Sequence, residues 1–157
     1  ACVEYIRDMD LKPNIFPDDY RKKAEIYRLY HWFDTLFKKE VLDPIIYEKV
    51  FSRVIENLSP NSINLRNGMQ NLGFHIKYLE YLLKDKDFLV LDTITSCDFF
   101  AAANLSVLDY LGLLNLDDYP KLKVWYFKLK SRPSFKKILK DYIVGLTPHE
   151  NYKLLDI

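Results

Sequence analysis

The chain has 157 residues, enough for one domain with a full hydrophobic core, and its 49% hydrophobic and 29% charged residues are typical of a soluble globular protein. The net charge of +1 implies no bulk electrostatic partner. Only 4 glycines occur and hairpin signals with flanking alternation are missing, which excludes a hairpin-rich β protein and predicts an all-α domain.

The first residues, Ala1 to Met9, are predicted to form the end of a helix, and residues 10–17 a linker that contains Pro13 and Pro17. Because the chain begins inside a helical pattern without an initiator Met, we expect a fragment or a processed product. The two cysteines, Cys2 and Cys97, suggest reduced thiols in a cytoplasmic protein. No secretory signal and no apolar run of membrane-spanning length is present, so we expect no membrane insertion.

A long helix is predicted next, capped by Asp18 or Asp19 and continuing towards Val54. Pro44 removes one backbone donor inside it, so we expect a kink or a break there. The apolar and aromatic faces of this helix carry Tyr20, Ala24, Tyr27, Trp32, Phe33, Leu36 and Phe37.

Four further helices and a packed tail are predicted after a turn at residues 58–61. The second long helix starts at Ser62, and a later helix has Pro120 in its first turn. The sequence Ser131-Arg132-Pro133 ends that helix and precedes a short one with Phe135, Ile138 and Leu139. The tail from Val144 is too apolar to be free, so we expect it to pack back on the helices.

The most informative stretch lies between these elements, at residues 94–103. Thr95 and Asp98 have the spacing of an N-terminal capping box, and few polar residues interrupt the helix that follows, to about Leu111. A buried helix start must satisfy its own N–H groups, so loss of this cap should cost about 1–2 kcal/mol. Asp98 could instead be catalytic and Cys97 a reactive thiol at a helix N-terminus, but the spacing favours a structural carboxylate and a small buried residue.

Charge is uneven near the C-terminus. Residues 121–140 hold eight basic residues and no acidic one. This run is either a solvated face of two helices or a docking surface for an acidic partner. No nucleic-acid-binding motif accompanies it, and the three histidines, His31, His75 and His149, lack metal-ligand spacing, so we predict neither nucleic acid nor a metal. The candidate docking face comprises Lys128, Arg132, Lys136, Lys137 and Lys140.

Several of these motifs together are similar to a known family. Phe88-Leu89, the Thr95-to-Asp98 box, Tyr119-Pro120 with Trp125, and Arg132-Pro133-Ser134-Phe135 resemble the helical C-terminal domain of the glutathione S-transferase superfamily. The resemblance implies an all-α helical bundle over residues 17–157. It implies that residues 1–16 are the end of a thioredoxin-like domain, otherwise missing from this chain, and the interdomain linker. It also implies a homodimer for the full-length protein.

A narrower resemblance concerns function. The stretches Trp32 to Phe51, Leu105 to Gly112 and Gly145 to Asp156 resemble the FtsZ-localised, glutathione-transferase-like division proteins of alphaproteobacteria. This implies a protein-interaction module in cell division, with FtsZ or another division protein as partner. The alternative is the helical, substrate-binding half of a glutathione transferase or related isomerase. The chain alone is then not catalytic, but the full-length protein could be.

The superfamily resemblance also implies where substrates would lie. Glutathione and the catalytic Tyr, Ser or Cys belong to the thioredoxin-like domain, so we expect no cofactor in this chain and glutathione only in the full-length protein. The helical domain would supply a wall for the second, apolar substrate or a partner face, for which Tyr27, Tyr30, His31 and Asp34 are the candidates. Aromatic residues at helical spacing more often simply pack in the core, and we favour that interpretation.

Overall fold

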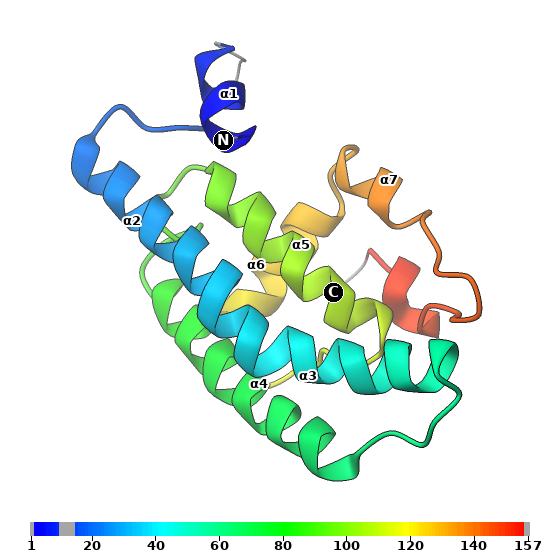
Figure 1. Ribbon diagram of the computed structural model, residues 1–157. Helices are drawn as coiled ribbons and strands as arrows, with labels where there is room; N and C mark the ends of the chain where they lie inside the picture. The colour runs from blue at the N-terminus through cyan, green and yellow to red at the C-terminus, as the bar shows by residue number, and fades with distance from the viewer. Residues whose placement is uncertain (1, 10–14, 156–157) are drawn as a thin grey trace.

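The computed structural model describes residues 2–9 and 15–155, and its regular elements there are all helices, which confirms the all-α prediction (Figure 1). Elements η1 and η2 have π-helical hydrogen bonding and η3 is a 3₁₀ turn. In chain order the elements are α1 (Cys2–Asp8), α2 (Tyr20–His31), η1 (Trp32–Leu42), α3 (Asp43–Ile46), η2 (Tyr47–Ile55), α4 (Ser62–Leu82), α5 (Ser96–Tyr110), α6 (Pro120–Lys130), α7 (Phe135–Ile138) and η3 (Glu150–Lys153).

Helices α2, η1, α3 and η2 follow one another as a single helical rod from Tyr20 to Ile55. Of the two outcomes expected at Pro44, a kink or a break, the helix does not break: the residues at the junctions keep right-handed helical backbone angles, and Figure 1 shows the rod bending near α3, which contains Pro44. The hydrogen-bond register changes to π in η1, and Pro44 falls in the first turn of α3. A first-turn proline is tolerated because its missing N–H needs no partner there.

Helix α5 occupies the centre of the bundle and packs against α2, η1 and α6. Its buried start carries a capping box, in which the Asp98 carboxylate accepts the Thr95 N–H at 2.8 Å and the Thr95 hydroxyl at 2.6 Å. The same carboxylate accepts the Leu89 N–H and the Trp125 indole N–H, both at 2.9 Å. Asp98 therefore joins the loop before α5, the start of α5 and helix α6.

Two further carboxylates join elements across the bundle. Glu48 of the rod is buried and accepts the Asn61 N–H at 2.6 Å, directly before α4. Glu80 of α4 accepts the N–H groups of Lys121 and Leu122, at 3.2 and 2.7 Å, in the first turn of α6. A carboxylate at a helix N-terminus satisfies otherwise unpaired donors and interacts favourably with the helix dipole.

The C-terminal segment packs back on α5, as predicted, for the residues described up to 155. The Tyr110 hydroxyl donates to the Leu146 carbonyl at 2.6 Å and accepts the Ile143 N–H at 3.0 Å. The His149 N–H donates to the Tyr110 carbonyl at 2.9 Å, and Tyr152 is buried against the Tyr110 ring. This segment therefore has a defined position beside the end of α5.

Part of the predicted linker, residues 10–14, lies outside the described residues, so the predicted boundary at residues 16 and 17 stays a prediction. Helix α1 agrees with the expected end of a helix at Ala1 to Met9. Asp19 caps α2 by accepting the N–H groups of Arg21 and Lys22. Among the described residues, no helix combines the length and the apolar character needed to cross a membrane.

Candidate functional site

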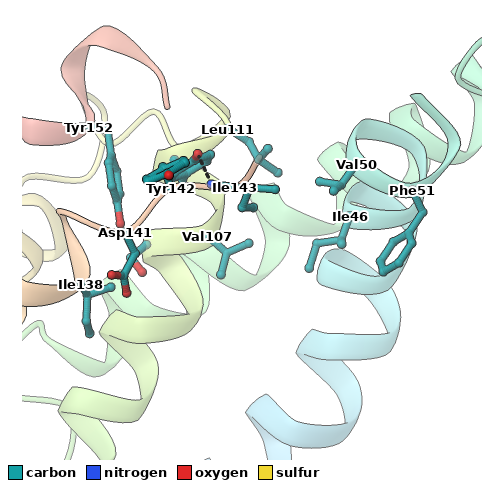
Figure 2. A pocket seen from close by; sticks show the side chains of 12 residues that line it. Ile46, Val50, Phe51, Val107, Leu111, Ile138, Asp141, Tyr142, Ile143 and Tyr152 are labelled. Atoms are coloured by element: carbon teal, nitrogen blue, oxygen red, sulfur yellow. Dashed lines mark hydrogen bonds between the residues drawn. The ribbon is translucent and has the colours of Figure 1, made fainter. Parts of the chain in front are cut away.

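An apolar groove of about 390 Å³ lies between the rod, α5 and the segment after α7 (Figure 2). The rod contributes Ile46, Val50 and Phe51, and α5 with the residue that follows it contributes Val107 and Leu111 among others. Ile46 and Val50, like Val107 and Leu111, are four residues apart, so each pair lies on one face of its helix. Two apolar helix faces therefore form the floor and one wall of the groove.

The other wall is built by Ile138, Tyr142 and Ile143. Residues 143–146 form a tight turn in which the Leu146 N–H donates to the Ile143 carbonyl, and Gly145 supplies the positive φ of 83°. The two hydrogen bonds of the Tyr110 hydroxyl hold both ends of this turn. These hydrogen bonds therefore attach the wall to the end of α5.

Large apolar side chains at the mouth of the groove are exposed: 48% for Phe51, 74% for Tyr142 and 45% for Ile143. Asp141 is the one carboxylate of the lining. Exposed apolar residues gathered at a concave surface are typical of a site that binds another molecule. The lining carries no paired acid and base, so the groove is suited to binding and offers no evident chemistry.

Comparison with known proteins identifies the family to which this helical architecture belongs. The model of the glutathione S-transferase C-terminal domain matches residues 67–141. FtsZ-localized protein A of Caulobacter vibrioides is 39% identical over 99% of this chain, which covers 68% of that protein. This chain belongs to the family of FtsZ-localized protein A, within the glutathione S-transferase superfamily.

Solved structures show the same backbone. FzlA from C. crescentus has a TM-score of 0.94 at 39% identity, over 99% of this chain and 69% of that one. A glutathione S-transferase from Rhodospirillum rubrum F11 has a TM-score of 0.92 at 35% identity, over 99% of this chain and 70% of that one. The all-α C-terminal fold of the glutathione S-transferases is thus present, and the chain spans about 70% of these relatives.

The residues that the superfamily resemblance offered as a substrate or partner wall do not line the groove. Tyr27 and Tyr30 border a small hollow near Phe16 at the other end of the rod, and the Tyr30 ring meets Phe100 edge-on at 5.2 Å. His31 and Asp34 are exposed. The role of these four residues as a substrate or partner face therefore stays a prediction, separate from the groove.

The basic run at residues 121–140 is not one continuous surface. Lys130 is fully buried, where its ammonium group contacts an Asp109 carboxylate oxygen at 2.7 Å and lies between the Tyr126, Phe127 and Tyr152 rings. Burial and the neighbouring Asp109 raise the pKa of Tyr126, which donates to the same oxygen. Lys123 pairs with Asp117 at 3.0 Å. A count of charges along the sequence does not distinguish these two lysines, which form ion pairs with aspartates, from the lysines of the run that form none with the described residues.

The five residues of the candidate docking face divide into two groups. Lys128 and Arg132 lie over the rings of Phe88 and Phe99, at 4.7 and 5.6 Å from the ring centres. Lys136, Lys137 and Lys140 are exposed, and no carboxylate of the described residues pairs with them. These three follow α6 on the same segment that builds the wall of the groove.

Among the described residues, no group of three or more His, Cys, Asp or Glu side chains is arranged to hold a metal ion. Burial, and secondarily the Asp98 carboxylate, raise the pKa of the Cys97 thiol to about 12, so this thiol stays protonated and unreactive near neutral pH. His75 is buried and its Nε2 lies 2.9 Å from a Glu40 oxygen. This pair holds η1 to α4, and the sequence pattern did not reveal it because 35 positions separate the two residues.

Proposed function

We propose that this chain is the helical part of a cytoplasmic, glutathione-transferase-like protein that binds FtsZ, or another division protein, during bacterial cell division. The observation that carries the proposal is the 39% identity to FtsZ-localized protein A, which runs through 99% of the chain. The fold alone would not support the proposal, because one fold serves many functions.

The geometry supports a protein-interaction role. The groove exposes apolar side chains at its mouth, and Lys136, Lys137 and Lys140 lie on the same segment without ion-pair partners among the described residues. Apolar contacts supply most of the affinity of such a surface, and the charges raise the rate of encounter with an acidic partner. The attraction weakens with salt, because screening acts over roughly 8 Å at physiological ionic strength.

Cosedimentation of the full-length protein with polymerised FtsZ tests the proposal. The wild type should pellet with filaments, and replacing Lys136, Lys137 and Lys140 with Glu should weaken pelleting most at low salt. The control carries the same change of charge at Lys22, Lys39 and Lys84, which are also exposed. A wild type that stays in the supernatant contradicts FtsZ binding. Equal pelleting of both variants at all salt concentrations contradicts the role of the basic residues.

A second candidate is the substrate-binding half of a glutathione transferase, favoured by the apolar groove and its volume of about 390 Å³. The lining of the groove does not fit glutathione itself, which has two carboxylates and no large apolar side chain. Any glutathione site of the full-length protein would therefore use residues outside this groove. Saturable conjugation of glutathione to a chlorinated nitrobenzene by the full-length protein would support this candidate, and loss of turnover in Val107→Glu would assign the groove to the electrophile.

A further inference from the structure

The strongest unassigned feature of the surface is that the apolar groove has cations on both of its sides. Lys137 and Lys140 are exposed, and they are one and two positions from Ile138, a lining residue at the end of α7. Lys49 and Arg53 border a hollow of about 150 Å³ that shares Tyr110 and Leu111 with the groove. Positive charge therefore borders the groove on the side of Lys49 and Arg53 and, on the side of α7, is carried by exposed residues next in sequence to the lining, which is itself largely apolar.

None of these four cations has an ion-pair partner within residues 2–9 and 15–155. The acids nearest in sequence on the rod are engaged elsewhere: Glu48 is buried on Asn61, and Glu56 accepts the Tyr47 hydroxyl at 3.2 Å. Asp141 is the one carboxylate of the lining. Unpaired positive charge on two sides of an apolar groove matches a molecule that is apolar in the middle and acidic at both ends.

We propose that the groove binds a short peptide segment of a partner protein, with two or three large apolar side chains between flanking Asp or Glu residues. The proposal rests on the proposed FtsZ association, since it names the chemistry that this surface would recognise in a division protein. The apolar side chains occupy the space between Val50, Val107 and Ile143. The carboxylates meet Lys49 and Arg53 on one side, and Lys137 and Lys140 on the other.

The shape of the site favours a peptide over a flat lipid surface. The groove is concave and open, so a bilayer would leave its floor uncovered, whereas a narrow chain with projecting side chains fills it. The two hydrogen bonds of the Tyr110 hydroxyl, to the Ile143 N–H and the Leu146 carbonyl, hold this wall in position in the protein without a ligand. A preformed wall lowers the ordering cost of binding.

Selection from a random peptide library displayed on phage tests the proposal with the immobilised full-length protein. The variant Phe51→Glu/Ile143→Glu serves for counter-selection, because both side chains lie exposed at the mouth and their replacement leaves the core intact. The wild type should enrich peptides with clustered Leu, Ile, Phe or Trp flanked by Asp and Glu. Enrichment of basic peptides, or none beyond the counter-selected variant, overturns the proposal.

Recovered peptides are then titrated with fluorescence anisotropy. Phe51→Glu/Ile143→Glu should weaken binding about tenfold or more, and Lys137→Glu/Lys140→Glu and Lys49→Glu/Arg53→Glu should each weaken it several-fold, less at high salt. Tyr20→Glu, at an aromatic residue 72% exposed at the start of α2 and outside the groove, is the control and should bind as the wild type does. Equal affinity in all variants contradicts the groove as the site.

The two proposals fail separately. A protein that pellets with FtsZ filaments but enriches no such peptide contradicts the peptide groove alone. A protein that enriches acidic, apolar peptides but does not pellet with FtsZ filaments contradicts FtsZ as the partner. The assignment of the groove as a peptide-binding site still holds in that case.

Discussion

At the scale of single residues, Asp98 shows which of its hydrogen bonds a local sequence pattern predicts and which it does not. The spacing from Thr95 to Asp98 predicts a capping box, and the box is present. The sequence did not reveal that the same carboxylate also accepts the Leu89 N–H and the Trp125 indole N–H, because these donors come from other segments. A carboxylate with four bonds is more important for stability than a cap alone.

Replacing Asp98 with Ala should therefore lower the free energy of unfolding by about 3 kcal/mol or more, beyond the 1–2 kcal/mol of an ordinary cap, because three N–H donors lose their buried acceptor. Urea denaturation of both proteins measures this difference. Asp92→Ala, at an exposed acid just before the cap, is the control and should leave the midpoint unchanged. A midpoint for Asp98→Ala close to that of the control would show that the network contributes little.

Lys130 shows the opposite case, in which the pattern of charges along the sequence does not predict whether a side chain is exposed or buried. In the sequence it is one of eight basic residues in a run without acids, yet in the fold its ammonium is enclosed by aromatic rings and bound to Asp109. Helical spacing places it on the same side of α6 as Tyr126, which is also buried. Whether a lysine lies on a solvated or a buried face depends on the tertiary partner, here Asp109 from α5.

At the scale of elements, the helix starts were largely predictable and their connections were not. Asp19, Ser62, Thr95 and Pro120 mark the starts of four helices because capping residues and first-turn prolines act locally. Glu48 and Glu80 act across elements, at separations of 13 and about 40 positions, and carry no local signature. The rod through Pro44 depends on a π-helical register that spacing does not specify.

Helix α4 carries an outer stripe that faces away from the bundle, with Ile63, Phe74 and Tyr81 exposed. We propose that this stripe contributes to the homodimer that the superfamily resemblance implies. Phe74→Glu/Tyr81→Glu should convert a dimer of the full-length protein to monomer, as measured by light scattering after gel filtration. Phe51→Glu, in the groove, is the matched control and should remain dimeric. A double variant that stays dimeric would exclude this stripe from the interface.

At the scale of the whole molecule, the candidate site arises from three segments far apart in sequence: Ile46 to Phe51, Val107 to Leu111, and Ile138 to Ile143. Each segment looks like an ordinary apolar stretch, so the sequence predicted the helices without predicting the groove. The turns of the long helix near Tyr27 and Asp34, which the resemblance indicated, lie away from this groove, and their role as a substrate or partner face stays a prediction. A site of this kind becomes visible only when the elements are packed.

The central claim is that the groove and its cationic edges form the partner-binding surface. Hydrogen–deuterium exchange of the full-length protein, alone and with polymerised FtsZ, tests it most directly. If the groove is the contact surface, filament binding should slow exchange of the backbone amides in residues 138–146 and in the part of the rod around Val50, and leave α4 unchanged. Filament binding that slows exchange only outside these segments would contradict it.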